Sequence, residues 1–177
     1  KDTSTENEEK PIVILILAES LYEIENVDDL DFNKEVLPNL EQYKIVNSIS
    51  PSYGGRTVSA EFEALTGLSN YYITSDDTAY TTYMYSKAPE TGSIAREFLK
   101  NGYHTVAIHA NSKSFYGRDS AYVCMGFDEF IGKEDMEIQD TDFLASGYAK
   151  DEVLSRYLIK TIAEAEQPTF IFGASIE

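Results

Sequence analysis

The 177-residue chain is long enough to bury the core of one domain, and its 14 Lys and Arg against 31 Asp and Glu give a net charge of -17. This charge repels nucleic-acid phosphates and anionic lipid head groups, which argues against nucleic-acid binding and leaves any anionic substrate to a bound cation and local arginines. Cys124 is the single cysteine, so no internal disulfide and no thiolate metal cluster can form. The longest apolar run, Ile12 to Ala18, is too short to span a bilayer.

The first ten residues, KDTSTENEEK, are polar and without apolar periodicity, which indicates a linker ahead of a single domain over residues 11–177. The pattern then predicts a strand over Ile12–Ala18, a short helix or turn over Val36–Tyr43, a strand over Lys44–Ile49 and a helix from Thr57 that ends at Gly67. Further along it predicts a helix over Thr91–Asn101 before Gly102, a strand over Thr105–Ala110, a helix over Arg118–Met125 before Gly126, a helix over Asp151–Ala165 and a strand over Thr169–Ala174.

Strands that alternate with helices indicate an α/β fold with a mostly parallel sheet flanked by helices. The first run is almost continuously apolar and rich in β-branched residues, which is typical of a strand covered on both faces. In such sheets ligands bind outside the carboxyl ends of the strands. The residues at those ends are Glu19, then His109 and Asn111, and finally Ser175 and Glu177, so we expect a site at this edge.

Two glycines and an arginine precede the helix that begins at Thr57. Gly54 and Gly55 permit close backbone approach, and a helix start offers free N–H groups and a positive dipole end to an anion. Thr57 is therefore either an N-cap, the common role of threonine there, or a metal-activated nucleophile with Arg56 stabilising oxyanion charge. Glu19 is either a solvated strand end or an oxygen ligand for Mg²⁺, Mn²⁺ or Zn²⁺.

The segment HANSKSFYGRD, residues 109–119, combines an imidazole, an amide, two aromatic rings and an arginine after a strand. This set suits a small polar ligand that carries an anion, with Arg118 pairing with a phosphate and with Phe115 and Tyr116 as pocket walls. The alternative is a surface loop whose aromatic rings pack onto the core. A histidine without spaced partners, such as His109, is more typical of a residue that orients a loop than of a metal ligand.

Three spaced segments stand out: the strand and LAES over Ile12–Ser20, GGRTVSAEFEALTGL over Gly54–Leu68, and IHANSKSFYGRDSAYVCMGFDEF over Ile108–Phe130. Together they resemble the lipoteichoic acid synthase type of phosphoglycerol transferase, within the sulfatase or alkaline-phosphatase-like superfamily. The resemblance runs in register over nearly all of the chain after the linker. It implies an alkaline-phosphatase-like fold of which this chain is the N-terminal part.

The resemblance also implies roles for single residues. Glu19 matches a metal-binding glutamate, and Thr57 matches the nucleophile that also ligates the metal, commonly Mn²⁺. Arg118 matches the arginine that holds the phosphate, and Asn111 stands where some members have an aspartate that contacts the glycerol. Arg56 keeps the positive charge of a position that is often lysine. The candidate substrate-binding residues are Arg56, His109, Asn111, Phe115, Tyr116 and Arg118.

The family completes its metal site with an aspartate-histidine pair and adds a substrate-binding histidine, all of which would lie beyond Glu177. With two protein ligands in place of four, we expect this chain by itself to bind the metal weakly and to be catalytically inert. Family members carry N-terminal membrane helices and an extracytoplasmic catalytic domain. The resemblance therefore implies a membrane anchor in the full-length protein and a location at the cell membrane.

The implied activity is transfer of phosphoglycerol from an anionic phospholipid such as phosphatidylglycerol to a glycolipid or polymer, through a phospho-threonine intermediate. A phosphoethanolamine transferase, a phosphodiesterase or a sulfatase would use the same site at the start of the Thr57 helix. A sulfatase needs a Cys or Ser in a C/S-x-P-x-R setting, and it is disfavoured because the segment from Thr57 to Glu61 lacks both the proline and the arginine. The alternative from another class is a non-catalytic surface binding module that retained the fold.

Overall fold

The parallel sheet expected from the sequence forms the centre of the molecule. The computed structural model describes residues 10–19, 21, 27–43, 46, 50, 57–73, 79–81 and 92–176. Four strands in these ranges, β1 (Val13–Leu17), β2 (His104–His109), β3 (Glu129–Ile131) and β4 (Thr169–Ala174), form one sheet in the order β1-β4-β2-β3. All three pairings are parallel, so the predicted α/β fold is confirmed.

The register of the sheet brings three carboxyl ends into line. Leu17 at the end of β1 pairs with Ala174 at the end of β4, and Ala174 pairs on its other side with His109 at the end of β2. The residues that follow these strands therefore leave the sheet at one edge, as the alternation of strands and helices predicts.

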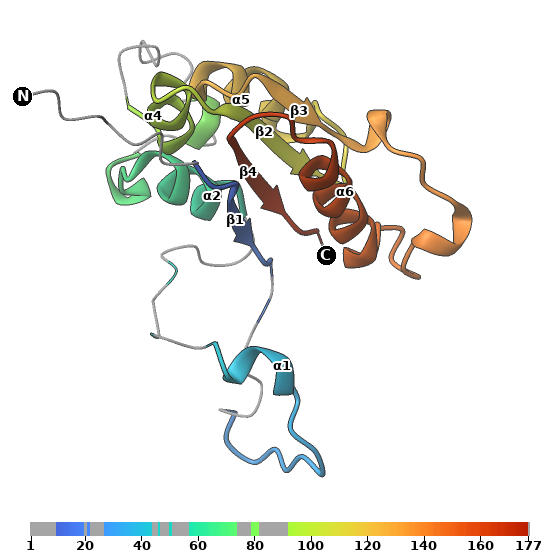
Figure 1. Ribbon diagram of the computed structural model, residues 1–177. Coiled ribbons are helices and arrows are strands. Elements are labelled where there is room, and N and C mark those ends of the chain that lie inside the picture. The colour runs from blue at the N-terminus through green and yellow to red at the C-terminus, as the bar shows by residue number, and fades with distance from the viewer. Residues whose placement is uncertain are drawn as a thin grey trace, which may run out of the picture.

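Helices cover both faces of the sheet (Figure 1). α2 (Thr57–Thr66), α4 (Ile94–Lys100) and α5 (Arg118–Met125) pack on one face, where Phe170 and Phe172 of β4 enter the core. α6 (Asp151–Glu164) packs on the other face against Ile171, because successive side chains of a strand point to opposite sides. No helix in the described ranges is long and apolar enough to cross a bilayer.

Short elements complete the described chain. α1 (Pro38–Glu41) lies within the predicted helix or turn and stands away from the sheet in Figure 1. Single 3₁₀ turns occur at Asn70–Tyr72, Phe115–Gly117, Lys133–Asp135 and Asp140–Asp142. The predicted strand over Lys44–Ile49 lies almost wholly outside the described residues, of which only Val46 belongs to it.

Several element boundaries agree closely with the sequence pattern. α5 and β4 have the predicted bounds, and the glycines expected to end helices, Gly67, Gly102 and Gly126, all have positive φ angles. Val58 and Phe62 of α2, which lie one turn apart, are both buried. On α4, Ala95 is buried, whereas the side chains of Ile94 and Leu99 are exposed.

β1 corrects one prediction. The run Ile12–Ala18 was expected to be covered on both faces, but exposure alternates along β1, and Ile14 and Ile16 are 42% and 54% exposed. The covered side chains, Val13 and Leu15, pack on the core that α2, α4 and α5 form. β1 is an edge strand of the described sheet, and α6 covers β2 and β4 rather than β1.

Gly126 ends α5 against another helix and gives a testable prediction. Its φ is 88°, and a Cβ atom placed there would lie 3.2 Å from Arg96 Cα. We expect Gly126→Ala to lower the free energy of unfolding by about 3 kcal/mol, from backbone strain together with the steric clash. Urea unfolding measures this loss.

Gly147→Ala is the matched control, because Gly147 has a φ of 87° but open space where its Cβ would lie. It should lose only the strain of the left-handed conformation, about 1 kcal/mol. Equal losses in the two variants would contradict the close approach of α5 to Arg96.

Candidate functional site

Glu19 and Thr57 meet at the carboxyl edge of the sheet. Glu19 follows β1 by two residues, and Thr57 is the first residue of α2. The Thr57 hydroxyl donates a hydrogen bond to Oε1 of Glu19, and both residues are half-buried. The structure thus brings together the hydroxyl and the carboxylate that the sequence placed in a common site. Arg56 lies outside the described residues.

Ser175 fixes the turn that carries Glu19. Its Oγ accepts a hydrogen bond from the Glu19 backbone N–H at 2.7 Å, and its own N–H donates to the Leu17 carbonyl at 3.1 Å. Ser175 is buried directly after β4, so the end of one strand holds the end of its neighbour. The sequence placed Ser175 at this edge without indicating this contact.

His109 lies at the same edge, and one of its ring nitrogens has no partner among the described residues. It is 1% exposed, and its Nδ1 lies 3.1 Å from the Ala174 carbonyl, so Nδ1 carries the proton and donates. Nε2 is buried and has no hydrogen-bond partner among the described residues. Burial, reinforced by the positive charge of Arg118, lowers the pKa of His109 to about 4. The ring is therefore neutral at pH 7 and leaves a lone pair on Nε2 for a donor group.

The low pKa of His109 predicts a loss of stability in weak acid. Its folded-state pKa of about 4 lies below the ordinary value of 6.5, so the unfolded chain binds the proton first as the pH falls. The contribution of the neutral His109 ring to the free energy of unfolding is complete above pH 6.5 and is lost as the pH falls towards 4. The loss between pH 7 and pH 5 amounts to about 2 kcal/mol. Urea unfolding at the two pH values, with a chelator present, measures it.

The variant His109→Gln removes this titration and keeps a side-chain donor for the Ala174 carbonyl. We expect its loss of stability between pH 7 and pH 5 to be smaller than that of the wild-type protein by about 2 kcal/mol. The same loss in both proteins would show that His109 is not a buried neutral ring.

Arg118 is held in a buried ion pair with Glu61. Nε donates to Oε2 at 3.2 Å and Nη2 donates to Oε1 at 2.5 Å, so the two side chains meet in a two-bond fork. Arg118 is 1% exposed and Glu61 is fully buried. Burial alone would raise the pKa of Glu61, but the charge and hydrogen bonds of Arg118 outweigh it and lower that pKa. The pair is therefore fully charged at pH 7.

Two tyrosines complete the bonding of the Glu61 carboxylate. The hydroxyl of Tyr80 donates to Oε2 at 2.6 Å, and the hydroxyl of Tyr122 on α5 donates to the same oxygen at 2.9 Å. Burial, followed by the negative charge of Glu61, raises the pKa of both phenols well above the usual value. Both phenols therefore keep their protons and remain donors.

The loop before α5 places its aromatic rings beside the guanidinium group. The Phe115 and Tyr116 ring centres lie 5.9 Å and 5.3 Å from Arg118 Cζ, within the range of cation–π attraction. Tyr116 has a φ of 59°, a left-handed conformation that is uncommon for a tyrosine. The two rings therefore lie beside the buried cation.

Asn111 begins the same loop and stabilises its first turn. Its Oδ1 accepts a hydrogen bond from the Ser112 N–H at 2.8 Å, and its carbonyl accepts one from the Lys133 N–H at 2.9 Å. The side-chain NH₂ has no hydrogen bond within the described part of the chain.

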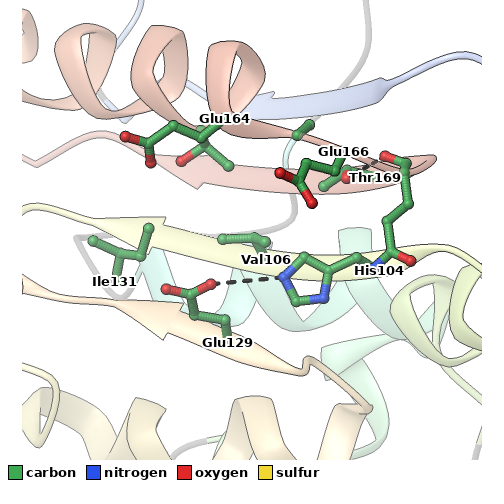
Figure 2. A pocket seen from close by; sticks show the side chains of 10 residues that line it. His104, Val106, Glu129, Ile131, Glu164, Glu166 and Thr169 are labelled. Atoms are coloured by element: carbon green, nitrogen blue, oxygen red, sulfur yellow. Dashed lines mark hydrogen bonds and ion pairs between the residues drawn. The ribbon is translucent and has the colours of Figure 1, made fainter.

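A cavity of about 540 Å³ lies at the opposite edge of the sheet (Figure 2). Its lining includes His104 and Thr169, at the amino ends of β2 and β4, together with Glu129, Glu164 and Glu166. His104 Nε2 lies 3.6 Å from Glu129 Oε2. Glu129, Glu164 and Glu166 repel an anion, so this cavity does not suit a phosphate-type ligand.

A comparison with known families identifies the fold. The sequence profile of the family named Sulfatase matches residues 11–177. The chain belongs to the sulfatase family. The fold and the superfamily expected from the spaced motifs are thereby confirmed.

Individual proteins that resemble this chain share between 22% and 31% sequence identity with it. A Rhizobium meliloti (strain 1021) protein named for cyclic beta-1,2-glucan modification is 31% identical over 168 residues, which cover 95% of this chain and 25% of the relative. The lipoteichoic acid synthase LtaP of Listeria monocytogenes superposes with a TM-score of 0.66 at 24% identity, over 94% of this chain and 40% of LtaP.

The phosphoglycerol transferase GacH of Streptococcus pyogenes, solved in complex with sn-glycerol-1-phosphate, superposes with a TM-score of 0.73 at 22% identity. The match covers 94% of this chain and 44% of GacH. The chain thus spans a quarter of the curated relative and less than half of each of these two structures.

Sulfatase-superfamily enzymes generally use a divalent metal. The Glu19 carboxylate and the Thr57 hydroxyl are hard oxygen donors in direct contact, and both suit Mg²⁺ or Mn²⁺. Within the described ranges, no three His, Cys, Asp or Glu side chains gather closely enough to hold a metal. The two donors therefore fit part of a metal site.

Proposed function

We propose that the protein is a metal-dependent phosphoglycerol transferase that moves glycerophosphate from a phospholipid to a glycolipid or polymer of the cell envelope. The observation that carries this proposal is the contact between the Thr57 hydroxyl and the Glu19 carboxylate at the carboxyl edge of a sulfatase fold. The structural neighbours named for lipoteichoic acid synthesis and phosphoglycerol transfer support it. The relative named for glucan modification supports a carbohydrate acceptor.

In this proposal the reaction proceeds in two displacements at phosphorus. The Thr57 oxygen attacks the phosphorus of the donor lipid, the bond to the diacylglycerol oxygen breaks, and diacylglycerol leaves with a proton. A hydroxyl of the acceptor then attacks the phosphothreonine, and Thr57 recovers its proton. Glu19 and Thr57 would hold the divalent metal, which would favour loss of the hydroxyl proton and stabilise charge on the phosphoryl oxygens.

The remaining residues would bind and orient the glycerophosphate group. Arg118 would donate to the phosphoryl oxygens, and Phe115 and Tyr116 would flank them. Nε2 of His109, which has no partner among the described residues, would accept a hydrogen bond from a glycerol hydroxyl, and the NH₂ of Asn111 would donate one. Arg56 would add positive charge beside the nucleophile.

The net charge of -17 makes these local groups necessary for an anionic donor. A catalytic domain on the extracytoplasmic side of the cell membrane, in a full-length protein with a membrane anchor, would place the site next to such a lipid. Residues 1–10 would then link the anchor to the sulfatase-like domain over 11–177.

A donor panel tests the proposed function. The full-length protein in detergent with Mn²⁺ is given phosphatidylglycerol, phosphatidylethanolamine or an aryl sulfate, and the release of diacylglycerol or sulfate is followed. We expect diacylglycerol release from phosphatidylglycerol at least about tenfold faster than from phosphatidylethanolamine, because a cationic amine does not suit the Arg118 site. Faster turnover of either other donor, or no turnover of any, would contradict the proposal.

A further inference from the structure

Glu61 occupies a position that is unusual for a carboxylate. It lies one turn after Thr57 on α2, so the two residues share a face of the helix. It is fully buried, and its two oxygens accept four hydrogen bonds, two from Arg118 and one each from Tyr80 and Tyr122. Three of these bonds reach Oε2 and one reaches Oε1, and full burial leaves the carboxylate to these partners inside the protein.

Stability alone is a weak reason for such a network. The free-energy cost of removing two charges from water is about equal to the gain from their attraction. Apolar residues of similar volume often give a fold of equal or greater stability. The Glu61–Arg118 pair instead fixes geometry, because a two-bond fork sets both the position and the plane of the guanidinium.

The fork leaves one edge of the buried Arg118 guanidinium without a carboxylate partner among the described residues. Glu61 takes the edge formed by Nε and Nη2, and the Phe115 carbonyl accepts one hydrogen of Nη1 at 3.3 Å. Nη2 carries a second N–H, so the edge between Nη1 and Nη2 keeps at least one donor for an oxyanion. The Glu61 carboxylate therefore decides which edge of the guanidinium an anion meets.

We propose that Glu61 is a positioning residue that sets the anion-binding edge of Arg118 relative to Thr57. Thr57, the candidate nucleophile, and Glu61, which orients the candidate phosphate-binding arginine, both lie on α2. The helix therefore fixes the distance between the attacking oxygen and the carboxylate that positions Arg118. This inference rests on the proposed function. It adds a residue that does not touch the substrate but determines where the substrate phosphate lies.

The experiment compares Glu61→Gln and Glu61→Asp in the full-length protein. Gln keeps the size and one acceptor but turns an NH₂ group towards Arg118, whereas Asp keeps the charge and the fork on a shorter stem. We expect Glu61→Gln to raise the KM for phosphatidylglycerol and lower kcat/KM by about ten- to a hundredfold, because misplacement by an ångström has effects of this size. Glu61→Asp should recover part of this loss.

Tyr122→Phe is the matched control, because it removes one hydrogen bond to the same carboxylate oxygen but leaves the fork intact. It should lower the melting temperature with KM nearly unchanged. A purely structural role for Glu61 would give all three variants a lower melting temperature and an unchanged KM, and that result would overturn the proposal.

Calorimetry of inorganic phosphate binding tests this inference independently of the proposed reaction. If phosphatidylglycerol is not turned over, the proposed function fails, but phosphate should still bind the wild-type protein about tenfold more tightly than folded Glu61→Gln. Equal phosphate affinity in the two proteins, or no phosphate binding by the wild-type protein, would overturn the inference.

Discussion

Replacement of Thr57 by valine is expected to lower kcat for phosphoglycerol transfer by at least about a thousandfold, because it removes the attacking oxygen and keeps the shape of the side chain. Thr57 is half-buried and its hydroxyl bonds to Glu19, so the variant loses one hydrogen bond but no core packing. Initial rates of diacylglycerol release from phosphatidylglycerol measure the effect. If the melting temperature of the variant changes little while its rate falls, the loss reflects catalysis and not folding.

Thr66→Val is the control for this substitution, since Thr66 ends the same helix and its hydroxyl donates to the Phe62 carbonyl at 2.7 Å. It should cost a little stability and leave kcat unchanged. If Thr57→Val retained more than a tenth of the wild-type rate, another group would have to be the nucleophile.

Arg118→Met is expected to lower the free energy of unfolding by about 3 to 5 kcal/mol, because it leaves the Glu61 charge buried without its counter-charge. The methionine matches the apolar stem of arginine but provides none of the donors that Glu61 accepts. Urea unfolding of the variant measures the loss. Arg156→Met, which breaks the exposed pair with Asp142 at 2.9 Å, is the control and should change stability little.

The double variant Arg118→Met/Glu61→Gln separates the two roles of Arg118. A neutral amide still accepts hydrogen bonds from Tyr80 and Tyr122, so much of the lost stability should return. Activity should not return, because no guanidinium remains to hold the phosphate. A stable double variant with wild-type KM would show that the Arg118 pair only supports the fold.

Local pattern was sufficient to predict most of the described elements. The apolar run Thr169–Ala174 and the Arg118–Met125 segment before Gly126 carry their own boundary signals, and both were located correctly. β3 has only three residues, too few for a hydrophobic period, and it is defined by pairing with β2. The exposure of Ile14 and Ile16 depends on where α6 packs, which a single strand does not encode.

The candidate site was predictable as a set of strand ends but not as a network. Parallel strands bring Glu19 and His109 to one edge by topology alone, and the structure places them there. Glu61 was missed because a glutamate in a helix is usually exposed, and its partners Tyr80 and Tyr122 lie 19 and 61 residues away. The available signal was its spacing, since Glu61 falls between Val58 and Phe62 on the buried side of α2.

Mass spectrometry of Thr57 tests the central claim most directly. The full-length protein is incubated with phosphatidylglycerol and Mn²⁺ in the absence of acceptor, quenched in acid and digested, and the peptide that contains Thr57 is analysed. The account predicts a glycerophosphate adduct on Thr57 that disappears when acceptor is added. Diacylglycerol release with unmodified Thr57, or with the adduct on another residue, would contradict it.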